Sequence, residues 1–345
     1  MGSFLKNLSG PVLATAATIG TAALAADPAS LLGPVSHVWL ENDLVVRTDQ
    51  HYTHGTRIAH VGGERPAEDN APGALGRLAA WLPTWGNEPV AWRPAASITQ
   101  NIYTPEDISR ADLIANDRPY AGWLYATGSL LKRGASPGGT PMLDAWSVHL
   151  GVVGPASLAE QSQNSVHRFR ALPLAQGWDH QLRNEPDVGL RYARALRYSA
   201  PVRGEFSGEF LPHVGVVAGS AQSFVSIGAQ WRVGLRLPQD FGWRSIDDVI
   251  LASGGRASQA PPTWGFHAFV GIDARAFAHN VLIEGNLFHD SHSMPIQRVV
   301  GELKVGLVYS GRRWDVAYTH QVRTPEYHGQ ADVDSFGSLS IAFKW

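Results

Sequence analysis

The sequence predicts an all-β protein: a twelve-stranded antiparallel transmembrane β-barrel with a short helix in an extracellular loop. The chain begins with a segment of signal-peptide type, it alternates apolar and polar residues over stretches of about ten residues, and it ends in such a stretch with a bare Trp345. Only 17% of its residues are charged, whereas 36 are Gly and 12 are Trp. Mean hydropathy is −0.12, as expected when one side of each strand faces lipid and the other a polar interior.

Residues 1–25 match a secretion signal, which leaves residues 26–345 as the outer-membrane barrel. Lys6 supplies a positive start, Leu8 to Leu24 is apolar and Ala-rich, and Ala23-Leu24-Ala25 fits the small-residue cleavage pattern. No other stretch approaches the 18 or so apolar residues of a membrane-spanning helix. The chain has no Cys, so it forms no disulfides and no thiolate metal site.

The alternation then places the strands in order. In the last of them, Leu339, Ile341 and Phe343 alternate with small or polar residues up to Trp345, which puts the apolar side chains on one face. The twelve predicted strands are 36–43, 53–62, 95–103, 121–132, 143–153, 188–198, 205–219, 223–236, 264–275, 297–310, 312–323 and 335–345. A thirteenth candidate, 281–288, is assigned to a loop, because a barrel with both ends in the periplasm has an even number of strands and turn residues bracket this segment.

The connections alternate between the two sides of the membrane, with 44–52, 104–120, 154–187, 220–222, 276–296 and 324–334 on the extracellular side. Two periplasmic connections, 63–93 and 238–263, are longer than usual. Helical spacing in Leu75 to Leu82 predicts an interfacial helix within the first. Aromatic residues near strand ends are expected to form girdles at the membrane interfaces, with core filling as the alternative: Trp39, Trp123, Tyr125, Trp231, Trp243, Trp264, Trp314 and Tyr318.

Oxygen-bearing side chains cluster at the predicted extracellular end of the first two strands. The segment Glu41 to Gly55 reads E-N-D-L-V-V-R-T-D-Q-H-Y-T-H-G. Side chains of this kind at one rim of a sheet suit a hard cation or a general acid/base site. The alternative is a polar hairpin loop without function.

A second polar segment on the same side, Asn116 to Gly122, reads N-D-R-P-Y-A-G. Pro119 biases Arg118 towards an extended backbone, from which its planar guanidinium is able to bind a phosphate or a carboxylate. The alternative for Arg118 is a structural ion pair.

A third segment, Gly151 to Pro186, carries a predicted loop helix. Pro155 starts this helix and Pro173 ends it. Gln163 and His167 are four residues apart and therefore share one helix face. His167 is a candidate general base, and a structural histidine is the alternative.

The motifs at these places resemble the outer-membrane lipid A 3-O-deacylase family. The matching motifs are E-N-D, Y-T-x-G, G-V-V-G-P, Q-N-x-x-H-R, G-W-D-x-Q-L and N-E-P, and the similarity is densest in residues 36–55, 98–122 and 147–186. The resemblance implies a Ca²⁺-dependent esterase site between the barrel wall and a loop helix, which releases the 3′-linked acyloxyacyl group of lipid A. The residues it implicates in this site are Asn42, Asp43, Thr53 and His167.

Two positions depart from the family pattern. Pro173 stands where the best-studied members carry a Glu, and a Lys of their second extracellular loop has no clear match. Glu185 or Asp179 are candidates to replace the acid, and Arg110 or Arg118 to replace the base.

The sequence therefore predicts a monomeric outer-membrane esterase acting on lipopolysaccharide. His167 would deprotonate water, while Ca²⁺, held partly by Asp43, would polarise the ester carbonyl. The expected site residues are Asn42, Asp43, Thr53 and His167 for catalysis, Asp43 for the metal, and Arg118 and Gln163 for the substrate. No G-x-S-x-G motif marks an acyl-serine mechanism, and the net charge of −2 with scattered basic residues does not favour a nucleic-acid partner. The alternatives are an outer-membrane phospholipase and a non-catalytic barrel, either a channel or a structural protein.

Overall fold

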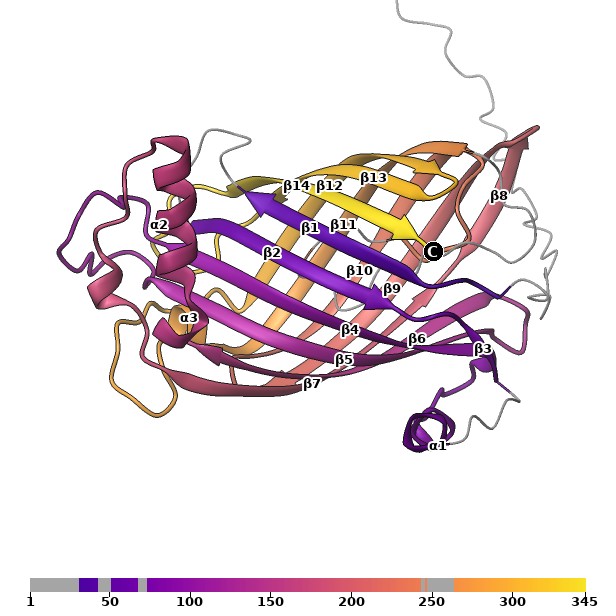
Figure 1. Ribbon diagram of the computed structural model, residues 1–345, viewed down its shortest axis with the longest axis horizontal. Helices are drawn as coiled ribbons and strands as arrows, with labels where there is room; N and C mark the ends of the chain where they lie inside the picture. The colour runs from indigo at the N-terminus through magenta and orange to yellow at the C-terminus, as the bar shows by residue number, and fades with distance from the viewer. Residues whose placement is uncertain (1–30, 43–50, 68–72, 243–245, 247–263) are drawn as a thin grey trace, which may run out of the picture.

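The computed structural model describes residues 31–42, 51–67, 73–242, 246 and 264–345 (Figure 1). The predicted signal peptide, Asp43 and Trp243 lie outside these residues. Twelve strands form the wall: β1 Val35–Asn42, β2 His51–Val61, β4 Glu88–Thr104, β5 Ala121–Ala135, β6 Pro141–Val153, β7 Glu185–Leu196, β9 Phe206–Gly219, β10 Gln222–Leu235, β11 Trp264–Asn280, β12 Val299–Gly311, β13 Trp314–Arg323 and β14 Asp334–Lys344. The elements outside this ring are β3 Arg65–Pro66, β8 Tyr198–Arg203, α1 Ala74–Trp81, α2 Ala159–Arg170 and α3 Val281–Glu284.

The sheet closes into a barrel because β1 pairs with β2 on one side and with β14 on the other, both antiparallel. Val38 faces Ile58 of β2 and Ile341 of β14. This closure confirms the predicted fold class, and each predicted strand matches a strand of the wall. The loop assignment of 281–288 is also correct, since α3 lies outside the ring.

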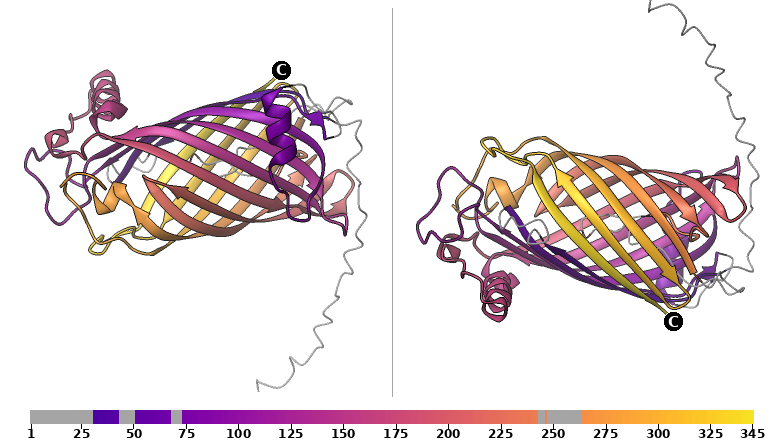
Figure 2. Two further views of the ribbon diagram at one scale, coloured as in Figure 1. Left: turned by 90° about the horizontal axis from the view of Figure 1, so that it is seen from below. Right: turned by 90° about the horizontal axis from the view of Figure 1, so that it is seen from above.

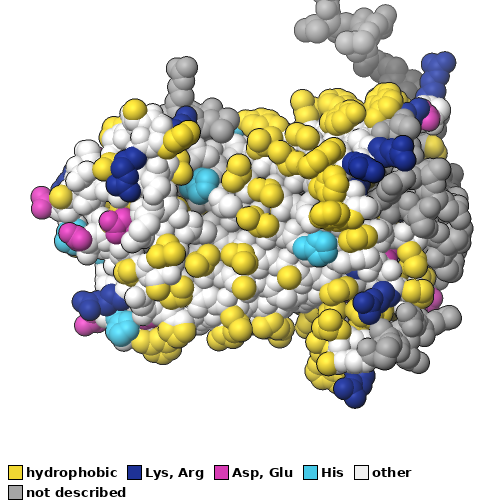
Figure 3. Space-filling view, viewed as in Figure 1, with side chains coloured by type: hydrophobic (Ala, Val, Ile, Leu, Met, Phe, Trp, Pro, Cys, Tyr) yellow, Lys and Arg dark blue, Asp and Glu magenta, His cyan; other side chains and the backbone are white. Residues whose placement is uncertain are grey.

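Side chains alternate between the lipid-facing and the inner side of the wall. Along β1, Val38 and Leu40 are exposed, whereas Trp39 and Glu41 are buried. The space-filling view shows apolar side chains spread over the outside of the barrel (Figure 3). The covering of the outer face by apolar side chains is what a bilayer requires.

The girdle prediction is wrong for three of its members. Trp39, Trp123 and Tyr125 are buried, because their positions in the alternation turn them into the barrel. Trp231, Trp264, Trp314 and Tyr318 are exposed on the outer face. An aromatic residue near a strand end therefore belongs to an interfacial girdle only if its side chain also points outwards.

Paired charges fill part of the barrel interior. Glu302 accepts from Arg323 at 2.6 Å and from Arg275 at 3.2 Å, and Lys304 lies 3.4 Å from it. Asp273 is bound by His213 at 2.6 Å and by Lys304 at 3.4 Å. Charges buried in this way are tolerable only when they are paired.

Part of the periplasmic connection between β10 and β11 also folds into the interior. Phe241 is buried in a cluster that includes the inward-facing Trp39. The backbone of Ile246 is held at both polar atoms: its N–H donates to Glu41 Oε1 at 2.8 Å, and its carbonyl accepts from Arg57 Nη1 at 2.9 Å. The described residues Phe241 and Ile246 of the long connection predicted from the sequence therefore pack in the lumen of the barrel.

The helices mark the two ends of the barrel. Helices α2 and α3 lie at one end, whereas α1, β3 and the C-terminus lie at the other (Figures 1 and 2). This separation agrees with the predicted sidedness of the connections. Among the residues described, no helix has the length and apolar character needed to cross a membrane.

Candidate active site

Helix α2 docks against the outer face of the wall at the extracellular end (Figure 1). It buries Ala159, Gln163 and His167, which are spaced four residues apart and so form one stripe along the helix. The predicted common face of Gln163 and His167 is therefore the face that covers the barrel.

The close approach of α2 depends on Gly122 in β5. A Cβ atom at this position would lie 2.0 Å from Ser157 Oγ and 2.3 Å from the Ala159 Cβ, far inside van der Waals contact. Gln100 in β4 adds a direct tie, since its Nε2 donates to the carbonyl of Ser157 at 2.6 Å. The last residue of the N-D-R-P-Y-A-G motif thus has a packing role beneath the loop helix.

A β-bulge places Thr53 at the rim of the wall. In the pairing of β2 with β4, Tyr52 faces Tyr103 and His54 faces Ile102, which leaves Thr53 as the extra residue. Its carbonyl accepts from Asn42 Nδ2 at 2.9 Å, and its hydroxyl lies 2.8 Å from Thr104 Oγ1. Asn42 therefore fixes the bulge across the β1–β2 pair.

A pocket of about 480 Å³ lies between α2 and the outer face of the wall. The residues that line it are Asn42, Thr53, His54, Thr56, Ile58, Ile98, Gln100, Ile102 and Leu124 from the wall, and Ser157, Leu158, Ser162, Gln163, Val166 and His167 from the loop. Ile58 and Ile98 are 60% and 61% exposed on the lipid-facing surface. The pocket thus joins a polar end near the rim to an apolar end that continues onto the membrane-facing wall.

Four predicted site residues meet in this pocket: Asn42, Thr53, Gln163 and His167. The Nδ1 atom of His167 lies 2.5 Å from the carbonyl oxygen of Pro173. A carbonyl only accepts hydrogen bonds, so Nδ1 carries the proton and Nε2 is the basic nitrogen of the neutral ring. Pro173, which departs from the family pattern, therefore orients the histidine through its main chain.

Gln163 is held in one orientation by Trp178. The indole Nε1 donates to Gln163 Oε1 at 2.9 Å, which identifies the opposite end of the amide as the NH₂ group. In the part of the chain that the structure describes, this buried Nε2 has no hydrogen-bond partner. An unpaired buried donor costs about 1–3 kcal/mol and calls for a functional explanation.

Arg118 lies outside the pocket. Its Nη1 donates to Glu326 Oε2 at 3.0 Å, its guanidinium stacks 4.5 Å from the centre of the Tyr103 ring, and it is buried. The neighbouring Asp117 accepts from the backbone N–H of Glu106 at 2.7 Å. The position of Arg118 matches the structural ion pair rather than the predicted substrate contact.

The suggested replacements for the family's acid and base also lie away from the pocket lining. Glu185 accepts from the backbone N–H groups of Leu287 and Phe288 at 3.0 and 2.7 Å, so it ties two extracellular loops together. Asp179 and Arg110 are exposed.

Asp43, the predicted metal ligand, follows Asn42 directly but lies outside the described residues. Within the described ranges, no three His, Asp or Glu side chains cluster as a metal site would require.

The sequence reasoning missed His54, Thr56 and Gln100. His54 Nε2 lies 2.7 Å from Thr56 Oγ1, and both residues line the pocket with Gln100. Alternation along the second and third strands predicts that these residues share the outer face. Their polarity on a lipid-facing surface was the available signal.

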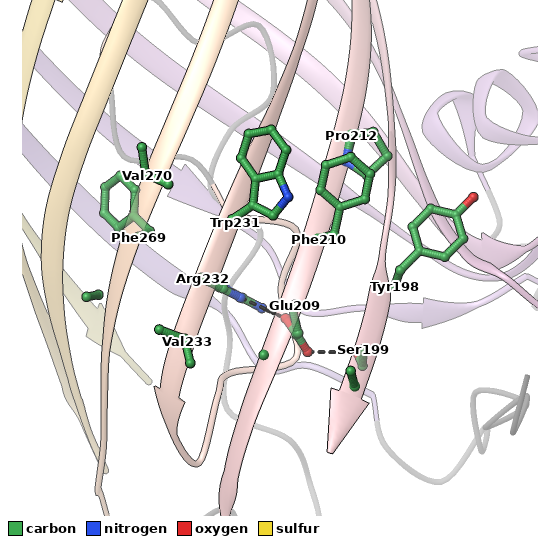
Figure 4. A pocket seen from close by; sticks show the side chains of 13 residues that line it. Tyr198, Ser199, Glu209, Phe210, Pro212, Trp231, Arg232, Val233, Phe269 and Val270 are labelled. Carbon is green, nitrogen blue, oxygen red and sulfur yellow. Dashed lines mark hydrogen bonds and ion pairs between the residues drawn. The ribbon is translucent and has the colours of Figure 1, made fainter. Parts of the chain in front are cut away.

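A larger hollow of about 940 Å³ lies on the outer wall across β8 to β11, where rings from neighbouring strands stand in a row (Figure 4). The rings of Phe210 and Trp231 are 5.0 Å apart. The carboxylate at its edge, Glu209, accepts from Arg232 at 2.7 Å and from Ser199 at 2.9 Å. This hollow offers an apolar lining and a neutralised ion pair, and no histidine lines it.

Comparison with known proteins agrees with the fold and the motifs. A family model described as "Outer membrane protein LpxR" matches residues 11–345. The solved structure of LpxR from Salmonella typhimurium is 16% identical, covers 90% of this chain and 100% of that chain, and superposes with a TM-score of 0.69. The β domain of the Bordetella autotransporter BrkA is 9% identical, with 92% and 100% of the two chains covered and a TM-score of 0.43. No match was found among curated protein sequences. Because the family model spans nearly the whole chain, this protein is an outer-membrane protein and belongs to the LpxR family, which confirms the resemblance found in the sequence.

Proposed function

We propose that this protein is a lipid A deacylase that hydrolyses the ester of the 3′-linked acyloxyacyl group. The observation that carries this proposal is the pocket between α2 and the outer wall. It brings together Asn42, Thr53, Gln163 and His167, and it continues onto the lipid-facing surface. Membership of the LpxR family supports a lipid A substrate.

The position of the pocket suits a substrate that stays in the outer leaflet. Ile58 and Ile98 offer an apolar path along the wall, and α2 exposes Val166 and Phe169 beside it. Acyl chains that lie along this path remain in an apolar environment, so their transfer into the pocket carries little hydrophobic cost. The ester group would then lie at the polar end of the pocket.

His167 is the proposed general base. Its Nε2 accepts a proton from the attacking water, and the ring becomes an imidazolium. As the acyl C–O bond breaks, the imidazolium returns this proton to the 3′ oxygen of the sugar, so the products are the 3′ hydroxyl and the free acid. The Pro173 carbonyl, 2.5 Å from Nδ1, keeps the ring in the required tautomer and accepts a stronger, charge-assisted hydrogen bond once the ring is charged.

Two amides prepare the rest of the site. Gln163, oriented by Trp178, donates from Nε2 to the ester oxygen as negative charge develops there. Asn42 holds the Thr53 bulge, which keeps the Thr53 hydroxyl at the rim.

The described residues of the pocket supply some, but not all, of the oxygen ligands that a hard cation needs. Asn42 and Thr53 offer neutral oxygen atoms of the kind that Ca²⁺ accepts, but no carboxylate lines the pocket among the residues described. We assign the missing carboxylate to Asp43, the next residue after Asn42. When bound, Ca²⁺ would act as a Lewis acid that polarises the ester carbonyl.

A phospholipase would use the same site, and only the product distinguishes it. The channel alternative has less support, since ion pairs and the segment at Phe241 occupy the barrel interior.

The test is mass spectrometry of lipids from outer membranes with and without expression of this protein. We expect lipid A that has lost its 3′ acyloxyacyl group, with phospholipids intact. Release of fatty acid from phospholipid alone would assign the phospholipase instead, and unchanged lipids with a folded barrel would leave a non-catalytic protein.

Replacement of the base gives the matching control. His167→Ala should lower turnover by about 10²–10⁴, whereas Ser165→Ala, at an exposed position of the same helix, should leave it unchanged. Near-normal turnover by purified, folded His167→Ala would remove His167 from the mechanism.

A further inference from the structure

The segment Ala74–Asn87, which we call the girdle segment, lies against the outside of the barrel at the periplasmic end. It consists of α1 and the turn that follows (Figures 1 and 2). Ala79 packs in a buried cluster with Trp92 of β4 and Leu130 of β5. The segment therefore covers the wall from outside, where a bilayer would otherwise contact the strands.

Beneath the segment the wall carries charged side chains on its outer face. Asp144 lies four residues before the exposed Val148 in β6, so the alternation along the strand points both side chains outwards. Asp144 is nevertheless fully buried. It accepts from Arg194 Nε at 2.8 Å and from Asn87 Nδ2 at 2.8 Å. The backbone of the segment also provides a hydrogen-bond acceptor for Arg194, since the Trp85 carbonyl accepts from Arg194 Nη1 at 2.9 Å. Outward charges of this kind are costly against lipid, and the segment shields them.

The turn of the segment completes an aromatic cluster on the wall. The Trp85 ring lies 5.4 Å from Trp146 and 5.0 Å from Tyr192, whose rings are 4.6 Å apart. Trp146 Nε1 donates to the Pro83 carbonyl at 3.0 Å. Trp85 has a φ of 34°, a left-handed conformation that costs a non-Gly residue about 1–2 kcal/mol. These contacts stabilise the backbone in that conformation and hold the ring at the barrel surface.

The outward side of the segment is apolar. Leu75, Leu78 and Trp81 of α1 are all exposed, and Trp81 is 76% exposed. The space-filling view shows hydrophobic side chains gathered there beside basic ones (Figure 3). Trp264 and Trp314, the first residues of β11 and β13, also expose their rings at this end of the barrel, so aromatic side chains face outwards at the periplasmic end of the wall as well.

We infer that the girdle segment is a membrane anchor that binds the interface of the periplasm-facing phospholipid leaflet. Exposed Leu and Trp side chains on a helix held parallel to the rim match the boundary between headgroups and acyl chains. A second protein is the other possible occupant of an apolar face, but the exposed Trp264 and Trp314 at the same end of the membrane-facing wall favour lipid. The inference rests on the outer-membrane location and not on the proposed activity.

The absence of Cys from the sequence allows a direct test. Leu78→Cys and Ala80→Cys lie about 160° apart around the helix, and both positions are exposed. Each variant is labelled with a nitroxide and reconstituted in phosphatidylethanolamine–phosphatidylglycerol vesicles. Electron paramagnetic resonance then measures collisions with oxygen, which concentrates in lipid, and with a water-soluble nickel chelate. Val148→Cys on the lipid-facing wall and Asp112→Cys in an extracellular loop supply the reference values.

We expect the label at Leu78 to resemble the one at Val148, with several-fold fewer nickel collisions than at Asp112, and the label at Ala80 to be closer to water. Nickel accessibility at Leu78 equal to that at Asp112 would overturn the inference. Protection of the Leu78 label from both oxygen and nickel would also overturn it, because that pattern indicates a covering protein.

Discussion

Trp178→Phe tests whether the indole N–H orients Gln163 for the reaction. The substitution keeps an aromatic ring near Tyr120, whose ring centre lies 4.9 Å from that of Trp178, and it removes the donor to Gln163 Oε1 together with one ring of the indole. Without it the amide is free to turn, so Nε2 is no longer fixed as the donor towards the pocket.

The magnitude follows from the one hydrogen bond that is lost. A neutral hydrogen bond of this kind contributes about 1 kcal/mol net, within a range of about 0.5–1.5. If this hydrogen bond orients Gln163 Nε2 in the transition state, its loss raises the activation free energy by about 1 kcal/mol. Turnover should then fall about fivefold, since about 1.4 kcal/mol corresponds to a factor of ten. Gln163→Leu removes the donor itself and should cost more, about 10²–10³, the loss typical of an oxyanion donor.

The assay is turnover of purified, folded protein on lipid A in mixed micelles, with each variant alone and both combined. If Trp178 acts only through Gln163, the double variant should be no slower than Gln163→Leu, because the two changes remove the same interaction. A further loss in the double variant would show that Trp178 acts in another way. Unchanged turnover of Trp178→Phe would refute the orienting role.

Three further outcomes are expected. Gly122→Ala should displace the loop helix and abolish activity while the barrel still forms, because the new Cβ would collide with Ser157 and Ala159; heat-modifiable mobility and turnover measure the two effects, and full activity would contradict the docking geometry. Chelation should stop hydrolysis, and Ca²⁺ should restore it better than Mg²⁺ because Ca²⁺ accepts irregular oxygen coordination; Asp43→Asn should weaken the Ca²⁺ response, and full activity in excess chelator would exclude an exchangeable catalytic metal. Deletion of Leu339–Trp345 should prevent assembly, since it opens an edge strand in lipid; protease-resistant protein in the outer membrane would count against the closed barrel.

The barrel was predictable because its signal is local. Each strand of the wall carries its own alternation, so the strands, their order and the sidedness of the loops follow without any long-range contact. The shared face of Gln163 and His167 was predictable for the same reason, since helical spacing fixes it.

The unpredicted features depend on contacts between distant segments. The bulge at Thr53 appears only when β2 is aligned with β4, and the role of Gly122 appears only when α2 lies on the wall. In the sequence, Pro173 only marks the absence of a family carboxylate. In the structure its main-chain carbonyl binds His167, because a backbone acceptor exists whatever the side chain. Arg118 looked available for substrate, but its partner Glu326 is 208 residues away.

The pocket opens on the lipid-facing wall and not into the lumen, and this changes what concentration means for its ligand. A molecule held in the leaflet reaches Ile58 and Ile98 by lateral diffusion in two dimensions, so occupancy follows its mole fraction among the surrounding lipids rather than its molarity in the solution. If the protein has the proposed activity, adding an inert amphiphile at constant total substrate should therefore slow turnover, because it dilutes the substrate within the membrane surface. By the same reasoning, an inhibitor for this pocket has to partition into the membrane first, and its potency will scale with that partitioning as much as with its fit.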